Sequence, residues 1–128
     1  MYCIDTNILI DILRGDEKLA LKLQNLHPFR LCISFISLCE LYKGAYAYHD
    51  SVIKVSDVKN FASSFYFLAL DEKICEEFGK MYSELKKKGK MIEESDLLIA
   101  SAVKVNDLTL ITRDKDFKNM DIKVEIWK

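Results

Sequence analysis

Four acidic residues in separate segments of the chain have the types and spacing for shared chemistry. Asp5 and Asp114 each follow a short apolar run, and Glu40 lies shortly after a third such run. Asp96 lies near the start of a strongly apolar stretch. In a parallel α/β sheet, the junctions that follow the strands open at one edge, and ligands bind there. We therefore expect the four carboxylates to converge on that edge.

Converging carboxylates repel one another, so at least one of them must be protonated or a cation must lie between them. Ligands that are all oxygen, without histidine or cysteine, suit hard ions such as Mg²⁺ or Mn²⁺. A site of this kind activates water and stabilises negative charge on a phosphoryl group, as metal-dependent nucleases do. The pattern thus predicts metal-assisted hydrolysis.

Each acid also has a purely structural interpretation, which stays open at this point. Asp5 could cap a helix, and residues 37–40 have the S-x-x-E pattern of a capping box. Asp96 could be an acid favoured by a helix dipole, although the neighbouring acids at 93–94 add more negative charge than a dipole requires. The acids within residues 114–116 are common in turns.

Short apolar runs alternate with longer amphipathic stretches, which predicts an α/β fold. We expect a three-layer α/β/α domain with a mostly parallel sheet of about five strands. The expected strands cover residues 2–4, 31–34, 65–70, 108–112 and 122–126. The expected helices cover residues 6–14 with Gly15 as the stop, Asp16 to His27-Pro28, 37–48, 51–64 (weakly), 71 to the lysines at 86–90, the stretch from 94, and a short segment at 114–120.

Composition narrows the class of protein. The 128 residues fit one domain, 1–128, and 50% of them are hydrophobic, which excludes a disordered chain. A formal net charge of -1 argues against holding nucleic acid by bulk positive charge. Four cysteines without a CxxC motif, and only two histidines, make a zinc site a poor interpretation. Because each cysteine lies in an apolar run, we expect buried, reduced thiols and a cytoplasmic location. We expect no signal peptide and no membrane span.

The sequence resembles the PIN-domain family, in particular its VapC-type toxins, over essentially the whole chain. Four segments carry the resemblance, in order and at the family's spacing: Ile4–Ile10 (IDTNILI), Ile36–Gly44 (ISLCELYKG), Asp96–Ala100 (DLLIA) and Leu110–Phe117 (LITRDKDF).

The resemblance implies a toxin ribonuclease of a type II toxin–antitoxin system that uses Mg²⁺ or Mn²⁺. Family members cleave RNA, typically form homodimers and are inhibited by a cognate VapB-type antitoxin whose tail covers the active site. The metal ligands and catalytic acids carried over are Asp5, Glu40, Asp96 and Asp114, with Asp116 as an auxiliary ligand. Asn7 and Thr112 would orient these carboxylates. Basic residues beside the site segments could contact RNA phosphates, and these are Arg14, Lys43 and Arg113; solvated surface charge is the alternative for each.

Three other functions fit these residues less well. An aspartyl-phosphate phosphatase needs D-x-D after its first strand, and Asn7 occupies the second position. A non-catalytic RNA-binding domain on a PIN-like fold predicts the loss of a site acid, whereas all four are present. A non-toxin PIN-like nuclease, acting in RNA processing or on DNA, usually carries further domains or insertions.

Overall fold

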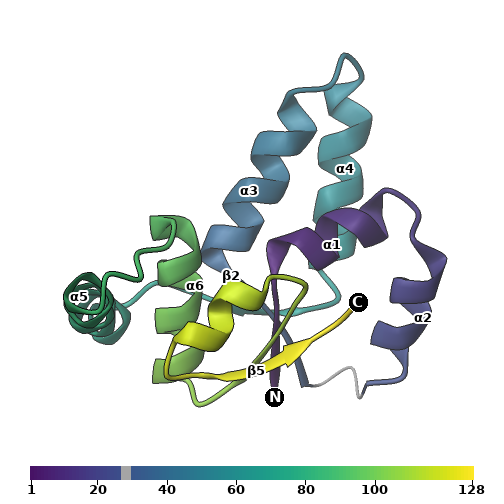
Figure 1. The fold of residues 1–128 in the computed structure, drawn as a ribbon. Coiled ribbons are helices and arrows are strands. Elements are labelled where there is room, and N and C mark those ends of the chain that lie inside the picture. The colour runs from purple at the N-terminus through teal and green to yellow at the C-terminus, as the bar shows by residue number, and fades with distance from the viewer. Residues whose placement is uncertain (27–29) are drawn as a thin grey trace.

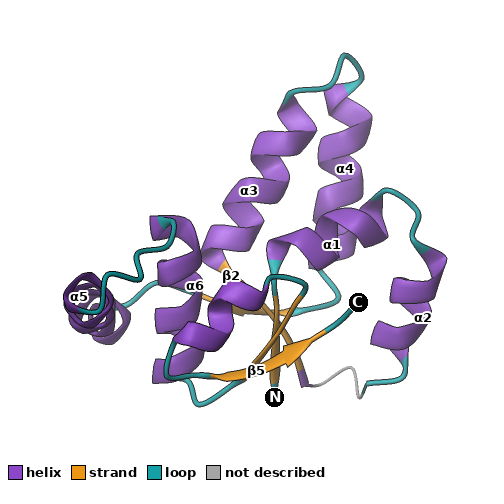
Figure 2. Cartoon of the chain, viewed as in Figure 1, coloured by secondary structure: helices purple, strands orange, loops and turns teal. Residues whose placement is uncertain are grey.

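The computed structural model describes residues 1–26 and 30–128 and has the predicted α/β architecture. In chain order, its elements are β1 (Tyr2–Ile4), α1 (Thr6–Leu13), α2 (Glu17–Gln24), β2 (Leu31–Ser34), α3 (Phe35–Tyr46), α4 (Ser51–Ala62), β3 (Tyr66–Leu68), α5 (Glu72–Lys87), α6 (Glu94–Val105), β4 (Thr109–Thr112), the 3-10 helix η2 (Lys115–Asn119) and β5 (Lys123–Ile126). Helices surround a central group of strands (Figures 1 and 2).

The five strands form one sheet in the order β3-β2-β1-β4-β5, and every pairing is parallel. β1 lies in the middle, where Cys3 pairs with Cys32 on one side and with Leu110 on the other. From β1 the chain reaches β2 on one side and, much later, β4 on the other side. The carboxyl end of β1 is therefore the topological switch point, where a ligand site is expected.

Alternate residues along the strands face two separate cores, because successive side chains of a strand point to opposite faces. Cys3, Cys32 and Leu110 pack with α5 and α6 on one face. The next residues along the same strands, Ile4, Ile33 and Ile111, pack with α1 to α4 on the other face. These two cores make the three layers that the alternation predicted.

Helix α6 is buried over most of its surface, as its nearly uniform apolar sequence predicted. Leu97, Ile99 and Val103 are among its fully buried side chains. α6 packs between the sheet and α5, whose stripe includes Met81 and Leu85. Burial on several sides fixes the position of the helix, and with it the position of the acids in its first turn.

Helices α3 and α4 form an arm that rises away from the sheet (Figure 1). α4 confirms the weak helical prediction for residues 51–64, although only Val58 is fully buried in it. At the foot of the arm, α1 packs against both helices. Its end at Leu13 is followed by Gly15 with φ of 99°, a left-handed conformation that glycine adopts without strain.

Two expectations from the sequence were wrong. Helix α3 begins at Phe35 rather than at 37, because Ser34 is the N-cap and its side chain accepts a hydrogen bond from the Ser37 N–H. Two of the four cysteines, Cys39 and Cys75, are exposed, because they lie on the outward faces of amphipathic helices. The expected helix end at His27-Pro28 lies outside the described residues; α2 ends at Gln24.

No helix in the described part of the chain is long and apolar enough to cross a membrane.

Candidate active site

Asp5 lies at the carboxyl end of the central strand and is the N-cap of α1. Its Oδ1 accepts a hydrogen bond from the Thr6 N–H at 2.8 Å, and its Oδ2 accepts one from the Thr112 hydroxyl at 2.6 Å. The side chain is almost fully buried, and this burial raises the pKa of Asp5, an effect that the hydrogen bonds from Thr112 and Thr6 oppose. The capping role and a role in a site are thus compatible.

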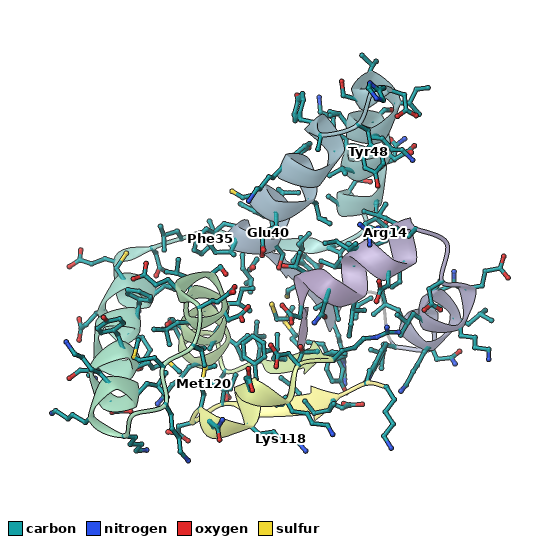
Figure 3. All side chains as sticks on the ribbon, turned by 45° about the horizontal axis from the view of Figure 1, so that its top comes forward. Arg14, Phe35, Glu40, Tyr48, Lys118 and Met120 are labelled. Carbon is teal, nitrogen blue, oxygen red and sulfur yellow. The ribbon has the colours of Figure 1, made fainter. Side chains whose placement is uncertain are left out.

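Glu40 lies in the second turn of α3, at the foot of the arm (Figure 3). The capping-box interpretation is wrong, because α3 begins before Ser37 and the Glu40 carboxylate is not at its start. The Glu40 Oε1 instead accepts a hydrogen bond from the Thr6 hydroxyl at 2.8 Å. Glu40 is therefore tied to the residue that follows Asp5.

Asp96 lies in the first turn of α6, after the N-cap Glu93, whose side chain makes no capping hydrogen bond. Partial burial and, after it, nearby negative charges together raise the pKa of Asp96 to about 7. These charges belong to Asp5, Asp114, Glu93 and Glu40. Three of them come from other elements, so the structure brings the predicted acids into one electrostatic group.

Asp114 follows β4 and is the N-cap of η2. Its N–H donates to the Thr112 hydroxyl at 3.0 Å, and the same hydroxyl donates to Asp5. Its Oδ1 accepts the Asp116 N–H at 2.9 Å, which is the turn geometry expected for this loop. Asp116 is exposed, and its charge is not among those that act on Asp5 or Asp96. Of the predicted acids, Asp116 therefore has the weakest connection to this electrostatic group.

The residues predicted to orient the carboxylates differ in what they contact. Thr112 connects Asp5 to the Asp114 backbone, as an orienting residue would. The Asn7 side chain has a buried oxygen, Oδ1, with no hydrogen-bond partner among the described residues. A buried amide oxygen needs a partner, which a water molecule or an ion would provide. Sequence reasoning missed Thr6 and Ser37, which also lie in this network.

The three candidate phosphate contacts occupy different surroundings. Arg113 pairs with Asp11 at 2.9 Å and with Asp16 at 3.4 Å, so its charge is largely neutralised by α1 and by the N-cap of α2. Arg14 and Lys43 are exposed. Their contact with phosphate remains a prediction.

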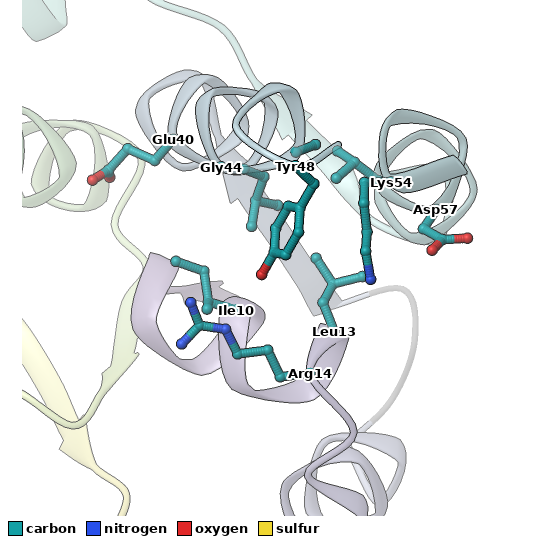
Figure 4. Close-up of a pocket in the computed structure, with 11 residues that line it drawn as sticks. Ile10, Leu13, Arg14, Glu40, Gly44, Tyr48, Lys54 and Asp57 are labelled. Atoms are coloured by element: carbon teal, nitrogen blue, oxygen red, sulfur yellow. The ribbon is translucent and has the colours of Figure 1, made fainter. Parts of the chain in front are cut away.

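A groove of about 140 Å³ lies between α1 and the α3–α4 arm. Its walls are mostly apolar, and Glu40 lies at one end of it (Figure 4). Tyr48 and Arg14 extend into the space between the helices (Figure 4). The residues lining the groove are Ile10, Leu13, Arg14, Glu40, Leu41, Gly44, Ala45, Tyr48, Lys54, Asp57 and Val58. The groove thus leads from an apolar surface to the acidic group.

The donor set fits a hard divalent cation in its chemistry. The ion pairs found in the described residues involve none of the four acids Asp5, Glu40, Asp96 and Asp114, so their charge is not neutralised by the protein. Within the described ranges, no three His, Cys, Asp or Glu side chains are already placed to hold a metal ion. A bound cation would therefore have to draw the carboxylates closer together. Without a cation, their mutual repulsion opposes this approach.

Comparison with known proteins identifies the family of this chain. The sequence model of the PIN domain matches residues 2–123. The chain is 31% identical to the ribonuclease VapC1 of Haemophilus influenzae strain R2866, over 99% of this chain and 98% of that protein. It is 29% identical to the ribonuclease VapC2 of H. influenzae strain Rd, over 98% and 97%. The crystal structure of VapBC2 from Rickettsia felis, bound to a DNA fragment from its promoter, contains a chain that superposes on this one with a TM-score of 0.92. The two chains are 28% identical, and the match covers 99% of this chain and 98% of that chain. The chain therefore belongs to the PIN-domain family.

Proposed function

We propose that this protein is a Mg²⁺- or Mn²⁺-dependent endoribonuclease and the toxin of a VapBC-type toxin–antitoxin system. One observation carries the proposal: four segments far apart in sequence bring carboxylates to the carboxyl edge of the sheet, unpaired by any basic residue of the described chain. Relatives along almost the full length are ribonucleases, which supports RNA as the substrate.

In the proposed mechanism, Asp5, Asp96 and Asp114 would hold the ion, and Glu40 would help to hold it or would orient the attacking water. A bound Mg²⁺ or Mn²⁺ supplies a water of lowered pKa and positive charge for the phosphoryl oxygens. Thr112 holds Asp5 and the Asp114 backbone in a fixed relation, so two ligands from β1 and β4 act as a unit. The reaction is hydrolysis, in which water adds to phosphorus as the bond to one ester oxygen breaks.

The test is cleavage of RNA by the purified protein with Mg²⁺, with Mn²⁺ or with EDTA. Asp5→Asn should abolish cleavage and keep the wild-type circular dichroism spectrum. Asp50→Asn is the matched control, because it makes the same chemical change at another site. Asp50 lies in the exposed turn between α3 and α4, and its side chain makes no capping hydrogen bond. Full activity of Asp5→Asn, or cleavage that is indifferent to EDTA, would contradict the proposal.

We also propose a VapB-type antitoxin as a partner, because several solved structures with this fold are VapBC complexes. The groove between α1 and the arm is the candidate site, since an apolar segment lying in it would reach Glu40. Leu13→Asp should weaken inhibition by the antitoxin and leave RNA cleavage unchanged. Equal inhibition of Leu13→Asp and wild type would place the antitoxin elsewhere.

A homodimer and a cytoplasmic location complete the proposal. Edge strand β3 exposes Tyr66 (52%) and Phe67 (54%), which supports a contact surface there. Sedimentation of wild type and Phe67→Asp tests this: a monomeric wild type would rule the dimer out. The four free cysteines support a reducing compartment.

A further inference from the structure

Thr6 contacts two of the four acids at once. Its N–H donates to the Asp5 carboxylate at 2.8 Å, and its Oγ1 lies 2.8 Å from the Glu40 Oε1. Thr6 is the first residue of α1, whereas Glu40 lies in α3, so the hydroxyl links two helices at the acidic site. With 6% of its surface exposed, Thr6 makes this link in a place that water scarcely reaches.

Two buried serines continue the link away from the site. The Thr6 Oγ1 lies 2.9 Å from the Ser37 Oγ, which lies 3.3 Å from the Ser34 Oγ. Both serines have no exposed surface. Ser34 is also the N-cap of α3 and accepts the Ser37 N–H at 3.1 Å. The hydroxyl row therefore starts at the residue that begins α3 and ends at a carboxylate of the same helix.

The chemistry of the row sets the direction of its hydrogen bonds. An ionised carboxylate can only accept, so the single Thr6 hydroxyl proton goes to Glu40. The Ser37 hydroxyl must then donate to Thr6, and the Ser34 hydroxyl must donate to Ser37. This order satisfies every buried hydroxyl, and such rows gain strength because each bond polarises the next.

We propose that Thr6 is a positioning residue, supported by Ser37 and Ser34, that fixes the Glu40 carboxylate beside Asp5 for metal binding. The proposal rests on the nuclease function proposed above and adds to it how the acid from α3 is held. A glutamate side chain has three rotatable bonds and, without this hydrogen bond, would sample several positions at the edge of the groove. Thr6 reduces that freedom, because it donates hydrogen bonds to both the Glu40 carboxylate and the Asp5 carboxylate.

The critical experiment compares Thr6→Val with Thr6→Ser. Valine keeps the shape of threonine and loses the hydroxyl, whereas serine keeps the hydroxyl. We measure the Mn²⁺ dissociation constant by calorimetry without RNA, and kcat and KM for RNA cleavage. Thr6→Val should weaken Mn²⁺ binding by about 10- to 100-fold, the range typical for residues that orient metal ligands. It should lower kcat and leave KM for RNA nearly unchanged, and Thr6→Ser should restore most of the loss.

A double-mutant cycle with Glu40→Gln shows whether Thr6 acts through Glu40. If it does, Thr6→Val should weaken Mn²⁺ binding much less in the Glu40→Gln background than in the wild type. Thr109→Val is the matched control, because Thr109 begins β4 at the opposite edge of the sheet. Should Thr6→Val fold poorly, Ser37→Ala tests the support of Thr6 instead, since it removes the donor to Thr6 and keeps the Thr6 hydroxyl. It should weaken Mn²⁺ binding by less than the loss of the Thr6 hydroxyl would, and an unchanged Mn²⁺ affinity would contradict the supporting role of Ser37.

The outcomes separate this inference from the proposed function. Normal Mn²⁺ binding and cleavage by Thr6→Val, in a protein whose wild type is active, would overturn the positioning role alone. Equal losses in the wild-type and Glu40→Gln backgrounds, or a Thr6→Ser variant as defective as Thr6→Val, would do the same. A wild type that neither binds Mn²⁺ nor cleaves RNA would overturn the proposed function, and the positioning role with it.

Discussion

Replacement of Asp96 by asparagine should stabilise the metal-free protein at neutral and alkaline pH. The two interpretations of Asp96 predict opposite signs for this change. If Asp96 served only the dipole of α6, its loss would cost about 0.3 to 1 kcal/mol. If Asp96 is instead crowded by other carboxylates, asparagine removes a repelled charge and the free energy of unfolding rises.

The magnitude follows from the folded-state pKa. Burial, followed by the charges of neighbouring acids, raises the pKa of Asp96 from 3.8 to about 7. At about 1.4 kcal/mol for each tenfold change in proton affinity, this difference corresponds to about 4 kcal/mol. Because the carboxyl is only partly buried, solvent screening reduces the effect, and we expect about 1 to 2 kcal/mol.

The pH dependence has a definite direction. An acid whose pKa is raised in the folded state costs no stability below its unfolded pKa, near 3.8, where both states are protonated. The cost grows as pH rises through the window between 3.8 and about 7, and it is complete above that window. The stabilisation by Asp96→Asn should therefore be less than half as large at pH 5 as at pH 8.

The assay is thermal unfolding of EDTA-treated protein at pH 5 and pH 8, where 1 kcal/mol shifts the Tm of a domain this size by about 3 to 5 °C. Glu94→Gln is the matched control, because Glu94 is an exposed acid in the same helix turn. Added Mn²⁺ should raise the Tm of the wild type more than that of Asp96→Asn. A variant less stable than the wild type at pH 8 would refute the crowding of Asp96.

Three further predictions concern the surroundings of the site. Arg113→Ala should lower the free energy of unfolding by about 1 kcal/mol in urea titration, because it releases Asp11 and Asp16 at partly exposed positions; a rise in KM for RNA without loss of stability would instead support phosphate contact. Ile99→Ala should cost about 2 to 5 kcal/mol by the same measurement, since Ile99 is fully buried in α6, and a cost below 1 kcal/mol would contradict tight packing there. Combining Arg14→Gln and Lys43→Gln should reduce the salt dependence of RNA binding by the inactive Asp5→Asn protein, measured by anisotropy, by a slope of about 1.4; an unchanged slope would exclude both phosphate contacts.

The placement of three of the acids, Asp5, Asp96 and Asp114, could be predicted because it follows from the pattern of apolar runs and from parallel strand pairing. Short apolar runs set the strands, parallel pairing sets the common edge, and Asp5 and Asp114 follow directly from the ends of β1 and β4. The uniform apolar character of α6 likewise fixed its central position, and with it that of Asp96. Neither inference needs the exact residue at which a helix begins.

The environment of Arg113 could not be predicted in this way. Its acidic partners, Asp11 and Asp16, lie about a hundred residues away in sequence, one at the end of α1 and one at the start of α2. From the sequence alone, an arginine next to a site acid could contact an RNA phosphate as readily as pair with acids of the protein. Only the packing of the α1–α2 turn against the loop after β4 shows that the guanidinium already has two carboxylate partners.

The row of hydroxyls from Thr6, Ser37 and Ser34 forms because α3 begins a few residues earlier than the capping-box pattern indicates. With Ser37 as the N-cap, its hydroxyl would be used by the backbone of α3 and Glu40 would close a capping box. With Ser34 as the N-cap, Ser37 lies inside the first turn, its hydroxyl becomes free to meet Thr6, and Glu40 moves one turn inward to the site. The two candidate caps are chemically identical, and serine is equally suited to both positions. Tertiary packing accompanies the observed choice, because Ile36 packs against the core formed with α5 and α6, and the buried Ser37 contacts Thr6 of α1. A local ambiguity that sequence rules cannot resolve thus decides whether Glu40 is a capping residue or part of the acidic site.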